Sequence, residues 1–270
     1  MKAIVTSAIC PLRSQPTHDS ERADEALCGM VVEILEKTTK DYWKVRTHYR
    51  YEGYAAVKNL RTDGVEEWEA MPKKVVLHKN TCDVQAGPKV QSWELLTVTR
   101  GAVLAVIGEA EEGWQKVQLP DGREGYVRAS WLDTLYENPI DLPEEELRRR
   151  LVETAKLFEG THYRWGGKTP EGIDCSGLVS TSYLLNGIII HRDASLKEGF
   201  PVREIPREEL KMGDLIFFPG HVAMYIENGD YIHSTGKAGS DGVVYNSLNP
   251  ASPIYRQDLD EKVTAAGTYF

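Results

Sequence analysis

The sequence predicts a multidomain protein in which two small all-β barrels precede an α+β domain. Three observations lead to this fold class. A pattern of short alternating strands occurs twice in the first half of the chain, a helical periodicity starts after Pro143, and several strand patterns follow it. The 270 residues, 41% of them hydrophobic, suffice for two or three domains with separate cores. We expect barrels at residues 1–65 and 74–136 and the last domain at residues 142–270.

The barrels are predicted from an internal repeat, in which the tryptophans lie 71 positions apart and the Gly-Tyr pairs 72. Apolar residues occur at alternating positions in short segments, and these segments are separated by turns with Gly or Asp-Gly, which is typical of short antiparallel strands. Asp121-Gly122 is one such hairpin turn. We expect residues 61–74, which are polar and charged, to join the barrels, and residues 136–143 to lead into the last domain. The two copies are Met30–Leu35, Trp43–Val45 and Gly53–Ala55, then Gly101–Ile107, Trp114–Val117 and Gly125–Val127.

The last domain begins with a helix that has proline near its start, acidic residues in its first turn and Gly160 as its end. The run Arg148–Arg150 is interpreted as a solvated face of this helix, since three basic residues do not make a nucleic-acid site. A second helix starts at Asp174-Cys175 and ends before Gly187. Helices packed against an antiparallel sheet are therefore expected. The strands are expected near residues 214–219, 221–227, 230–234 and 243–245 and at the C-terminus.

Cys175 is the candidate nucleophile because the pattern places it on the first turn of a helix. Unpaired N–H groups and the helix dipole there favour a thiolate, which lowers the pKa of a thiol from about 8.5 towards roughly 3.5–7.5. The alternative is a helix N-cap at Asp174 followed by a small buried cysteine without chemistry.

Two histidines follow in strand patterns, His221 at the start of one and His233 near the end of the next. The turn Asn228-Gly229 would pair these strands and bring the imidazoles close together. A catalytic cysteine needs an imidazole to take and return its proton, and that imidazole needs a third group to fix its tautomer. Cys175, His221 and His233 fit these three roles.

The motifs around these residues resemble those of the NlpC-type papain-like cysteine peptidases of bacterial cell-wall metabolism. The resemblance covers about residues 144–270 and implies a papain-like fold with Cys175 as nucleophile, His221 as general base and His233 as the third, polar member. The barrels resemble bacterial Src-homology-three-like domains. The peptidase motifs, in the order of the family, are Tyr163–Gly167, Asp174–Val179, Gly213–Phe218, His221–Tyr225 and Ile232–Ser234.

The resemblance also implies residues that bind the substrate. In the subgroup with N-terminal barrels, a Tyr-x-Gly-(Trp/Tyr) stretch supplies a tyrosine that helps bind a free amine, and Tyr51–Tyr54 resembles it with Tyr51 as that tyrosine; a core position is the alternative. Glu21, in a polar loop, is a weaker candidate for the acid that faces the amine, and a solvated carboxylate is the alternative. Further candidates, each with a structural alternative as helix cap, ion pair or packing residue, are Asp174, Ser176, Arg192, Asp193 and Trp165.

The function implied by this subgroup is hydrolysis of the bond between γ-D-glutamyl and an L-diamino acid in short murein peptides, during peptide recycling. The substrate would be L-Ala-γ-D-Glu-L-Lys or its diaminopimelate counterpart. A barrel that closes one end of the cleft would select peptides with a free N-terminus, since a buried ammonium must be paired. The alternatives are an exported hydrolase acting on intact peptidoglycan and, more remotely, a non-catalytic protein that binds murein peptides.

The composition limits the partners and the cellular compartment that we expect for this protein. A net charge of −9 argues against a nucleic-acid partner. The four cysteines, Cys10, Cys28, Cys82 and Cys175, have no CxxC pair or zinc-ligand spacing, which favours a reducing compartment. Residues 1–10 contain no leader-like apolar region and no long apolar run occurs, so we expect a cytoplasmic protein without a membrane partner. No metal or organic cofactor is implied, and nothing in the pattern indicates an oligomeric state.

Overall fold

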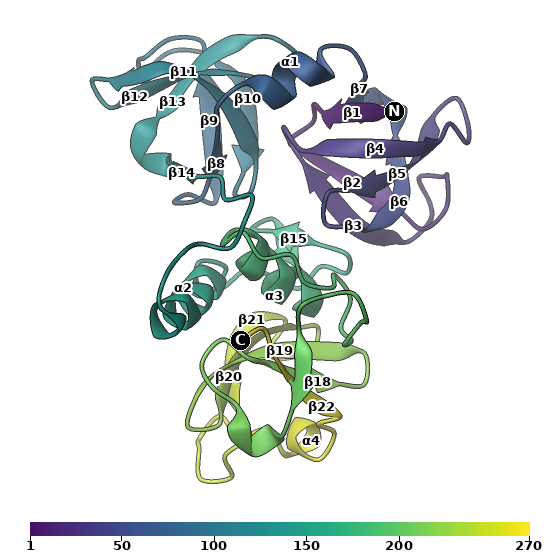
Figure 1. Ribbon diagram of the computed structural model, residues 1–270, viewed down its shortest axis with the longest axis vertical. Helices are drawn as coiled ribbons and strands as arrows, with labels where there is room; N and C mark the ends of the chain where they lie inside the picture. Colours follow the sequence, from purple (N-terminus) through teal and green to yellow (C-terminus); the bar gives the residue numbers. More distant parts are fainter. The chain divides into compact units, whose positions relative to one another are not determined.

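The computed structural model describes residues 1–270 as two compact units, residues 1–135 and 136–270 (Figure 1). The first unit holds two seven-stranded sheets, and the second holds a six-stranded sheet, a two-stranded sheet and three α-helices. No helix combines the length and the apolar character needed to cross a membrane.

The first sheet has the strand order β3-β2-β6-β5-β4-β1-β7, with antiparallel pairing between neighbours. A short 3-10 turn, η1, covers Val57–Asn59. The strands are β1 (Lys2–Val5), β2 (Ile9–Arg13), β3 (Arg22–Leu27), β4 (Val31–Glu36), β5 (Tyr42–Thr47), β6 (Glu52–Ala56) and β7 (Leu60–Arg61).

The second sheet repeats this topology strand for strand, in the order β10-β9-β13-β12-β11-β8-β14. The 3-10 turn η2 (Ala129–Trp131) takes the place of η1. Asp121-Gly122 lies in the hairpin between β12 and β13, where Gly122 has a φ of +91° and its N–H donates to the Leu119 carbonyl. The two β units expected from the repeat are thus confirmed. The strands are β8 (Lys73–Val76), β9 (Thr81–Gln85), β10 (Glu94–Thr99), β11 (Val103–Glu111), β12 (Trp114–Gln118), β13 (Glu124–Arg128) and β14 (Leu132–Thr134).

The segment between the two sheets differs from the polar connection expected from its composition. It contains the helix α1 (Val65–Ala70), whose Trp68 is 2% exposed and donates from Nε1 to the Gly29 carbonyl at 3.0 Å. Gly29 itself has a φ of +81°, and a Cβ there would lie 2.0 Å from the Val103 carbonyl oxygen. Cys28 packs into the core of the second sheet. The two β units of the first half are therefore packed directly against each other, and burial of Trp68 between Ile4 and Ala105 stabilises α1 in an otherwise charged segment.

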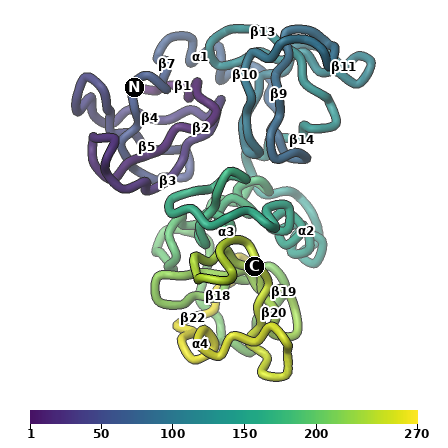
Figure 2. The backbone as a smooth tube through the Cα atoms, turned by 180° about the vertical axis from the view of Figure 1, so that it is seen from behind, coloured from purple at the N-terminus to yellow at the C-terminus, as the bar shows by residue number.

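The second unit packs helices against an antiparallel sheet of order β17-β22-β18-β19-β20-β21 (Figures 1 and 2). The helix α3 lies against α2 and against strands β19 and β20. The Asn228-Gly229 turn joins β19 to β20, and both of its residues have positive φ, as the sequence predicts. The helices are α2 (Glu144–Lys156), α3 (Cys175–Leu184) and α4 (Gln257–Asp260), with the 3-10 turn η3 (Arg207–Glu209). The strands are β15 (Lys168–Thr169), β16 (Gly172–Ile173), β17 (Arg203–Ile205), β18 (Leu215–Phe218), β19 (His221–Glu227), β20 (Asp230–Thr235), β21 (Gly242–Ser247) and β22 (Ala265–Thr268).

The basic run on α2 corrects one interpretation. Arg149 is exposed, but Arg148 is only 6% exposed and binds Asp214 Oδ1 at 2.8 Å and Glu144 Oε1 at 2.8 Å. Its guanidinium also lies over the Phe270 ring, 3.9 Å from the centroid. A periodicity argument assigns charged residues to the solvent face, whereas this arginine is buried because a buried carboxylate is available to pair with it.

Candidate active site

The start of α3 is held by a capping carboxylate and by a close backbone contact. Asp174 is the N-cap, and its Oδ1 accepts from the Gly177 N–H at 2.5 Å. A Cβ on Gly177 would lie 2.1 Å from the Gly167 carbonyl oxygen, so the loop that carries the Trp-Gly-Gly sequence rests directly on the first turn. Only glycine at position 177 permits this contact. Cys175 is the first residue of the helix and is 5% exposed.

Burial dominates the electrostatics of this cysteine. The pKa of the Cys175 thiol is raised to about 11, mainly by burial and also by the Asp174 carboxylate, against the lowering effect of the backbone N–H groups of Val222 and Ser176. The expected lowering by the helix N-terminus alone is therefore wrong, because loss of hydration costs the lone thiolate more than the helix end returns. The Val222 N–H donates to the sulfur, which places Cys175 beside the first residue of β19, His221.

The two imidazoles meet as the hairpin predicts. His221 Nε2 lies 2.7 Å from His233 Nδ1, and the rings are perpendicular with centroids 5.0 Å apart. His221 Nε2 is thus occupied by His233, and Nδ1 is the remaining nitrogen of the His221 ring. Burial lowers the pKa of His221 to about 4 and that of His233 to about 3, so both rings are neutral at neutral pH.

A proton can nevertheless move within this group. A lone thiolate or a lone imidazolium is costly at a buried site, as the raised pKa of Cys175 and the lowered pKa of His221 indicate. Transfer of the proton from Cys175 to His221 creates both ions together, so their attraction offsets part of the desolvation of each. Ion-pair formation by proton transfer is therefore less costly for two such buried groups than loss of a proton to solvent, and this is the chemistry required of a nucleophile and its base.

Four of the other candidate residues divide into inward and outward groups. Arg192 is 2% exposed and donates from Nη1 to Asp174 Oδ1 at 3.1 Å and to Ser176 Oγ at 2.8 Å. Ser176 Oγ donates in turn to Asp174 Oδ1 at 3.2 Å. These three side chains thus form a buried cluster that supports the nucleophile turn, which matches the structural alternative for Arg192. Trp165, by contrast, is 60% exposed.

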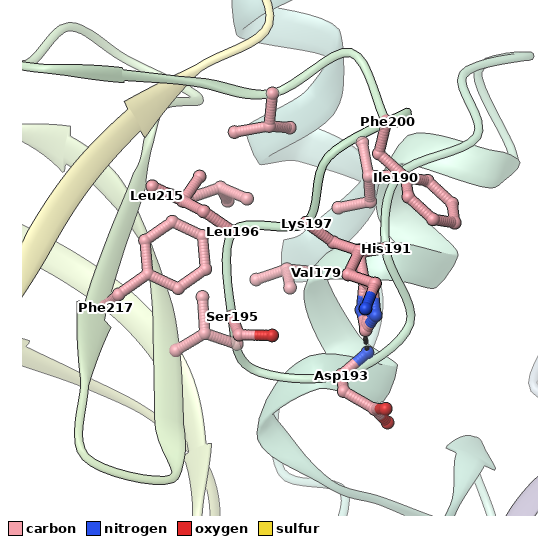
Figure 3. Close-up of a pocket in the computed structure, with 12 residues that line it drawn as sticks. Val179, Ile190, His191, Asp193, Ser195, Leu196, Lys197, Phe200, Leu215 and Phe217 are labelled. Atoms are coloured by element: carbon pink, nitrogen blue, oxygen red, sulfur yellow. Dashed lines mark hydrogen bonds between the residues drawn. The ribbon is translucent and has the colours of Figure 1, made fainter.

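Asp193 faces the other way from Arg192. It is exposed, and its backbone N–H donates to His191 Nδ1 at 3.1 Å (Figure 3). It borders a small, mainly apolar hollow lined by Val179, Leu215 and Val222 among others, and its carboxylate points away from the apolar side chains. Asp193 therefore remains accessible to a charged ligand.

Tyr51 and Glu21 belong to the first unit. Tyr51 is half-buried at the turn between β5 and β6, where its N–H donates to Thr47 Oγ1 at 3.0 Å. The core position nearby is taken by Tyr49, which is 4% exposed and donates to Asp24 Oδ2 at 2.5 Å. Glu21 is exposed and immediately precedes β3. A substrate role for Tyr51 and Glu21 stays a prediction.

Two neighbours of the site were not assigned from the sequence. Tyr163 forms a bridge with Ile173, and burial, followed by the charge of a Cys175 thiolate, raises the pKa of its phenol. Tyr163 belongs to the sequence motif Tyr163–Gly167, so this motif could have identified it as a neighbour of the site. The Oδ1 atom of Asn246, on β21, lies 2.9 Å from His233 Nε2. No sequence signal marks it, because only the pairing of β20 with β21 brings it to the histidine.

Comparisons with known proteins agree with this architecture. Residues 160–259 match the NlpC/P60 family, and residues 8–61 and 83–133 match the bacterial SH3 domain. The chain is 41% identical to Dipeptidyl-peptidase 6 of Lysinibacillus sphaericus, over 100% of both chains. It is 30% identical to a gamma-D-glutamyl-L-lysine dipeptidyl-peptidase of Bacillus cereus, over 81% of this chain and 68% of that one. The crystal structure of an NlpC/P60 family protein from Bacillus cereus aligns over 100% of this chain and 99% of that chain, with a TM-score of 0.79 and 25% identity.

Proposed function

This chain belongs to the NlpC/P60 family, and we propose that it is a cysteine endopeptidase that hydrolyses the γ-D-glutamyl–L-diamino acid bond of murein peptides. The observation that carries the chemistry is the 2.7 Å contact between His221 and His233 beside the helix-start Cys175. The substrate class is supported by the similarity, along the whole chain, to Dipeptidyl-peptidase 6 of Lysinibacillus sphaericus.

We assign the substrate as a short peptide with a free N-terminus, L-Ala-γ-D-Glu-L-Lys or its diaminopimelate counterpart, and the product as L-Ala-D-Glu. Similarity to the gamma-D-glutamyl-L-lysine dipeptidyl-peptidase of Bacillus cereus supports a lysine or lysine-like residue after the cleaved bond. Recognition of the free amine by Tyr51 and Glu21, a role in peptide recycling, and a cytoplasmic location all belong to this proposal.

The reaction follows from the protonation states of the site. His221 Nδ1 accepts the thiol proton of Cys175 as the sulfur attacks the γ-carbonyl carbon of the D-glutamyl residue. The tetrahedral oxyanion receives hydrogen bonds from the Cys175 N–H, at the helix N-terminus, and from the Tyr163 hydroxyl, whose raised pKa keeps it protonated. The C–N bond then breaks, and the imidazolium of His221 gives its proton to the leaving amine of the diamino acid.

Hydrolysis of the thioester completes the cycle. Neutral His221 takes a proton from water as the water oxygen attacks the acyl carbon, the S–C bond breaks, and the proton returns to the sulfur. Asp174, Ser176 and Arg192 act by holding the first turn of α3, because their hydrogen bonds are made to one another and to the loop below. Asp193 is the charged group available to the substrate.

A matched pair of peptides tests the proposal. L-Ala-γ-D-Glu-L-Lys and its N-acetylated form are incubated with the full chain, and the products are identified by mass spectrometry. We expect L-Ala-D-Glu and lysine from the first peptide and a large reduction in kcat/KM for the second. Cys175→Ala should abolish release of lysine while the variant still binds the peptide. Equal cleavage of both peptides would remove the free-amine proposal, and release of fragments from intact sacculi would favour an exported hydrolase.

A further inference from the structure

Beyond His233, the site contains a continuous series of hydrogen bonds that ends on the backbone. Asn246 Nδ2 donates to the Ile254 carbonyl at 3.2 Å, and Asn246 Oδ1 lies 2.9 Å from His233 Nε2. His233 Nδ1 lies 2.7 Å from His221 Nε2. We propose that Asn246 is a positioning residue that fixes the tautomer of both imidazoles, so that His221 presents an unprotonated Nδ1 to Cys175. This inference rests on the proposed function, in which His221 is the base.

The location of Asn246 follows from the pairing of two strands. On β20 and β21, His233 pairs with Val244 and Tyr231 pairs with Asn246. Residues two apart on a strand share a face, so Asn246 is the diagonal neighbour of His233 on the face that carries the imidazole. An amide side chain is long enough to cover this diagonal separation, which a serine or alanine would leave open.

The direction of each hydrogen bond is determined from the backbone end. A carbonyl oxygen can only accept, so Ile254 requires the amide nitrogen of Asn246 and turns its Oδ1 towards His233. That oxygen also only accepts, so the proton of neutral His233 must be on Nε2, and its Nδ1 is an acceptor. His221 therefore donates from Nε2, and its Nδ1 carries a lone pair. Each step leaves one choice because neither ring is charged at neutral pH.

The opposite tautomer would remove the base. If His233 carried its proton on Nδ1, His221 Nε2 would have to accept it, and the proton of His221 would then be on Nδ1. That nitrogen would face the thiol as a donor and could not take its proton. His233 is 0% exposed, so bulk water is not at hand to replace the amide oxygen.

The charges around the two rings explain why a neutral acceptor suits this place. Arg256 lowers the pKa of both imidazoles, and Asp174 raises that of His221. Tyr231 packs on His233 with ring centroids 5.1 Å apart and has a raised pKa, so it adds no charge. Asp258 binds the guanidinium of Arg256, and the charges of Asp258 and Asp260 both act on Tyr231. An amide in place of a carboxylate leaves the transferred proton on His221, from where it reaches the leaving amine.

Three variants of the full chain test the inference. Asn246→Leu removes the acceptor and excludes water, Asn246→Asp keeps the acceptor and adds a charge, and Asn249→Leu is the control at an exposed asparagine of the turn that follows β21. For Asn246→Leu we expect kcat to fall about 10–100-fold with KM nearly unchanged, the range seen when a functional histidine loses its outer partner. Asn246→Asp should keep kcat within a few-fold and move the acidic limb of the kcat/KM profile to higher pH, since a carboxylate stabilises an imidazolium.

A spectroscopic readout separates this inference from the proposed function. Nitrogen-15 NMR of the histidine rings distinguishes Nδ1–H from Nε2–H without any turnover. We expect Nε2–H on both His221 and His233 in the unaltered chain and in Asn246→Asp, and a mixture of tautomers in Asn246→Leu. Wild-type tautomers and wild-type kcat in Asn246→Leu would overturn the inference, as would Nδ1–H on His233 in the unaltered chain. An inactive but Nε2-protonated wild type would instead count against the proposed function alone.

Discussion

The substitution Gly177→Ala sets helix propensity against packing at the nucleophile. Alanine is favoured over glycine inside a helix by about 1 kcal/mol, so propensity alone predicts a more stable protein. The structure predicts the reverse, since the new Cβ would lie 2.1 Å from the Gly167 carbonyl oxygen and 3.0 Å from Asp174 Oδ1. Both obstacles are fixed, one by the backbone and the other by the capping hydrogen bond.

The size of the required movement determines the expected losses of stability and activity. The separation must grow by about 0.9 Å to reach 3.0 Å, the shortest distance that Cβ atoms tolerate. Strain of this kind costs about 1–3 kcal/mol, which exceeds the gain in propensity. The same movement displaces Cys175, two residues away, and a shift of about 1 Å at reacting groups reduces the rate about 100-fold.

The assay combines thermal unfolding with steady-state kinetics on L-Ala-γ-D-Glu-L-Lys. We expect a lower Tm and a kcat/KM reduced about 100-fold for Gly177→Ala. Ser180→Ala, at a buried position one turn further along α3, is the matched control and should retain nearly full activity. A Gly177→Ala variant with raised Tm and unchanged kcat/KM would show that the loop does not constrain the nucleophile turn.

Three further perturbations test the two units separately. Arg148→Ala should lower the free energy of unfolding of the second unit by about 3–5 kcal/mol, because it leaves the 1%-exposed Asp214 carboxylate without its cationic partner. Arg149→Ala should change that free energy little, and urea titration compares the two variants. Acidification tests His221, because burial lowers its pKa from 6.5 to about 4, so kcat/KM should persist below pH 6.5 and fall towards pH 4. Stability should decline over the same range, since the imidazole of the unfolded chain binds a proton there that the folded one does not. A loss of activity centred near pH 6.5 would contradict this expectation. Trp68→Ala should cost the first unit about 3–5 kcal/mol, and an unchanged unfolding midpoint would mean that α1 does not lock the two β units together.

Local patterns were sufficient for much of the fold. The repeat predicted two small β-barrels, and the structure has two β units whose seven-stranded sheets share one strand order. The Asn228-Gly229 turn predicted the hairpin that brings the two histidines together, because positive φ at both positions is a local requirement. Patterns were insufficient where burial decided the outcome. Trp68 and Arg148 lie in charged segments, and each is buried by a partner that is distant in sequence.

By itself the sequence determined the fold class, the place of Cys175 on a helix start and the pairing of His221 with His233, since each depends on residues close together in the chain. Only the tertiary structure decided that the thiol and the imidazoles are neutral at rest, and that Asn246 completes the series of hydrogen bonds. The physical reason is that desolvation and cross-strand contacts depend on which segments fold against one another. A local sequence pattern therefore predicts neither the desolvation of a side chain nor its contacts across a sheet.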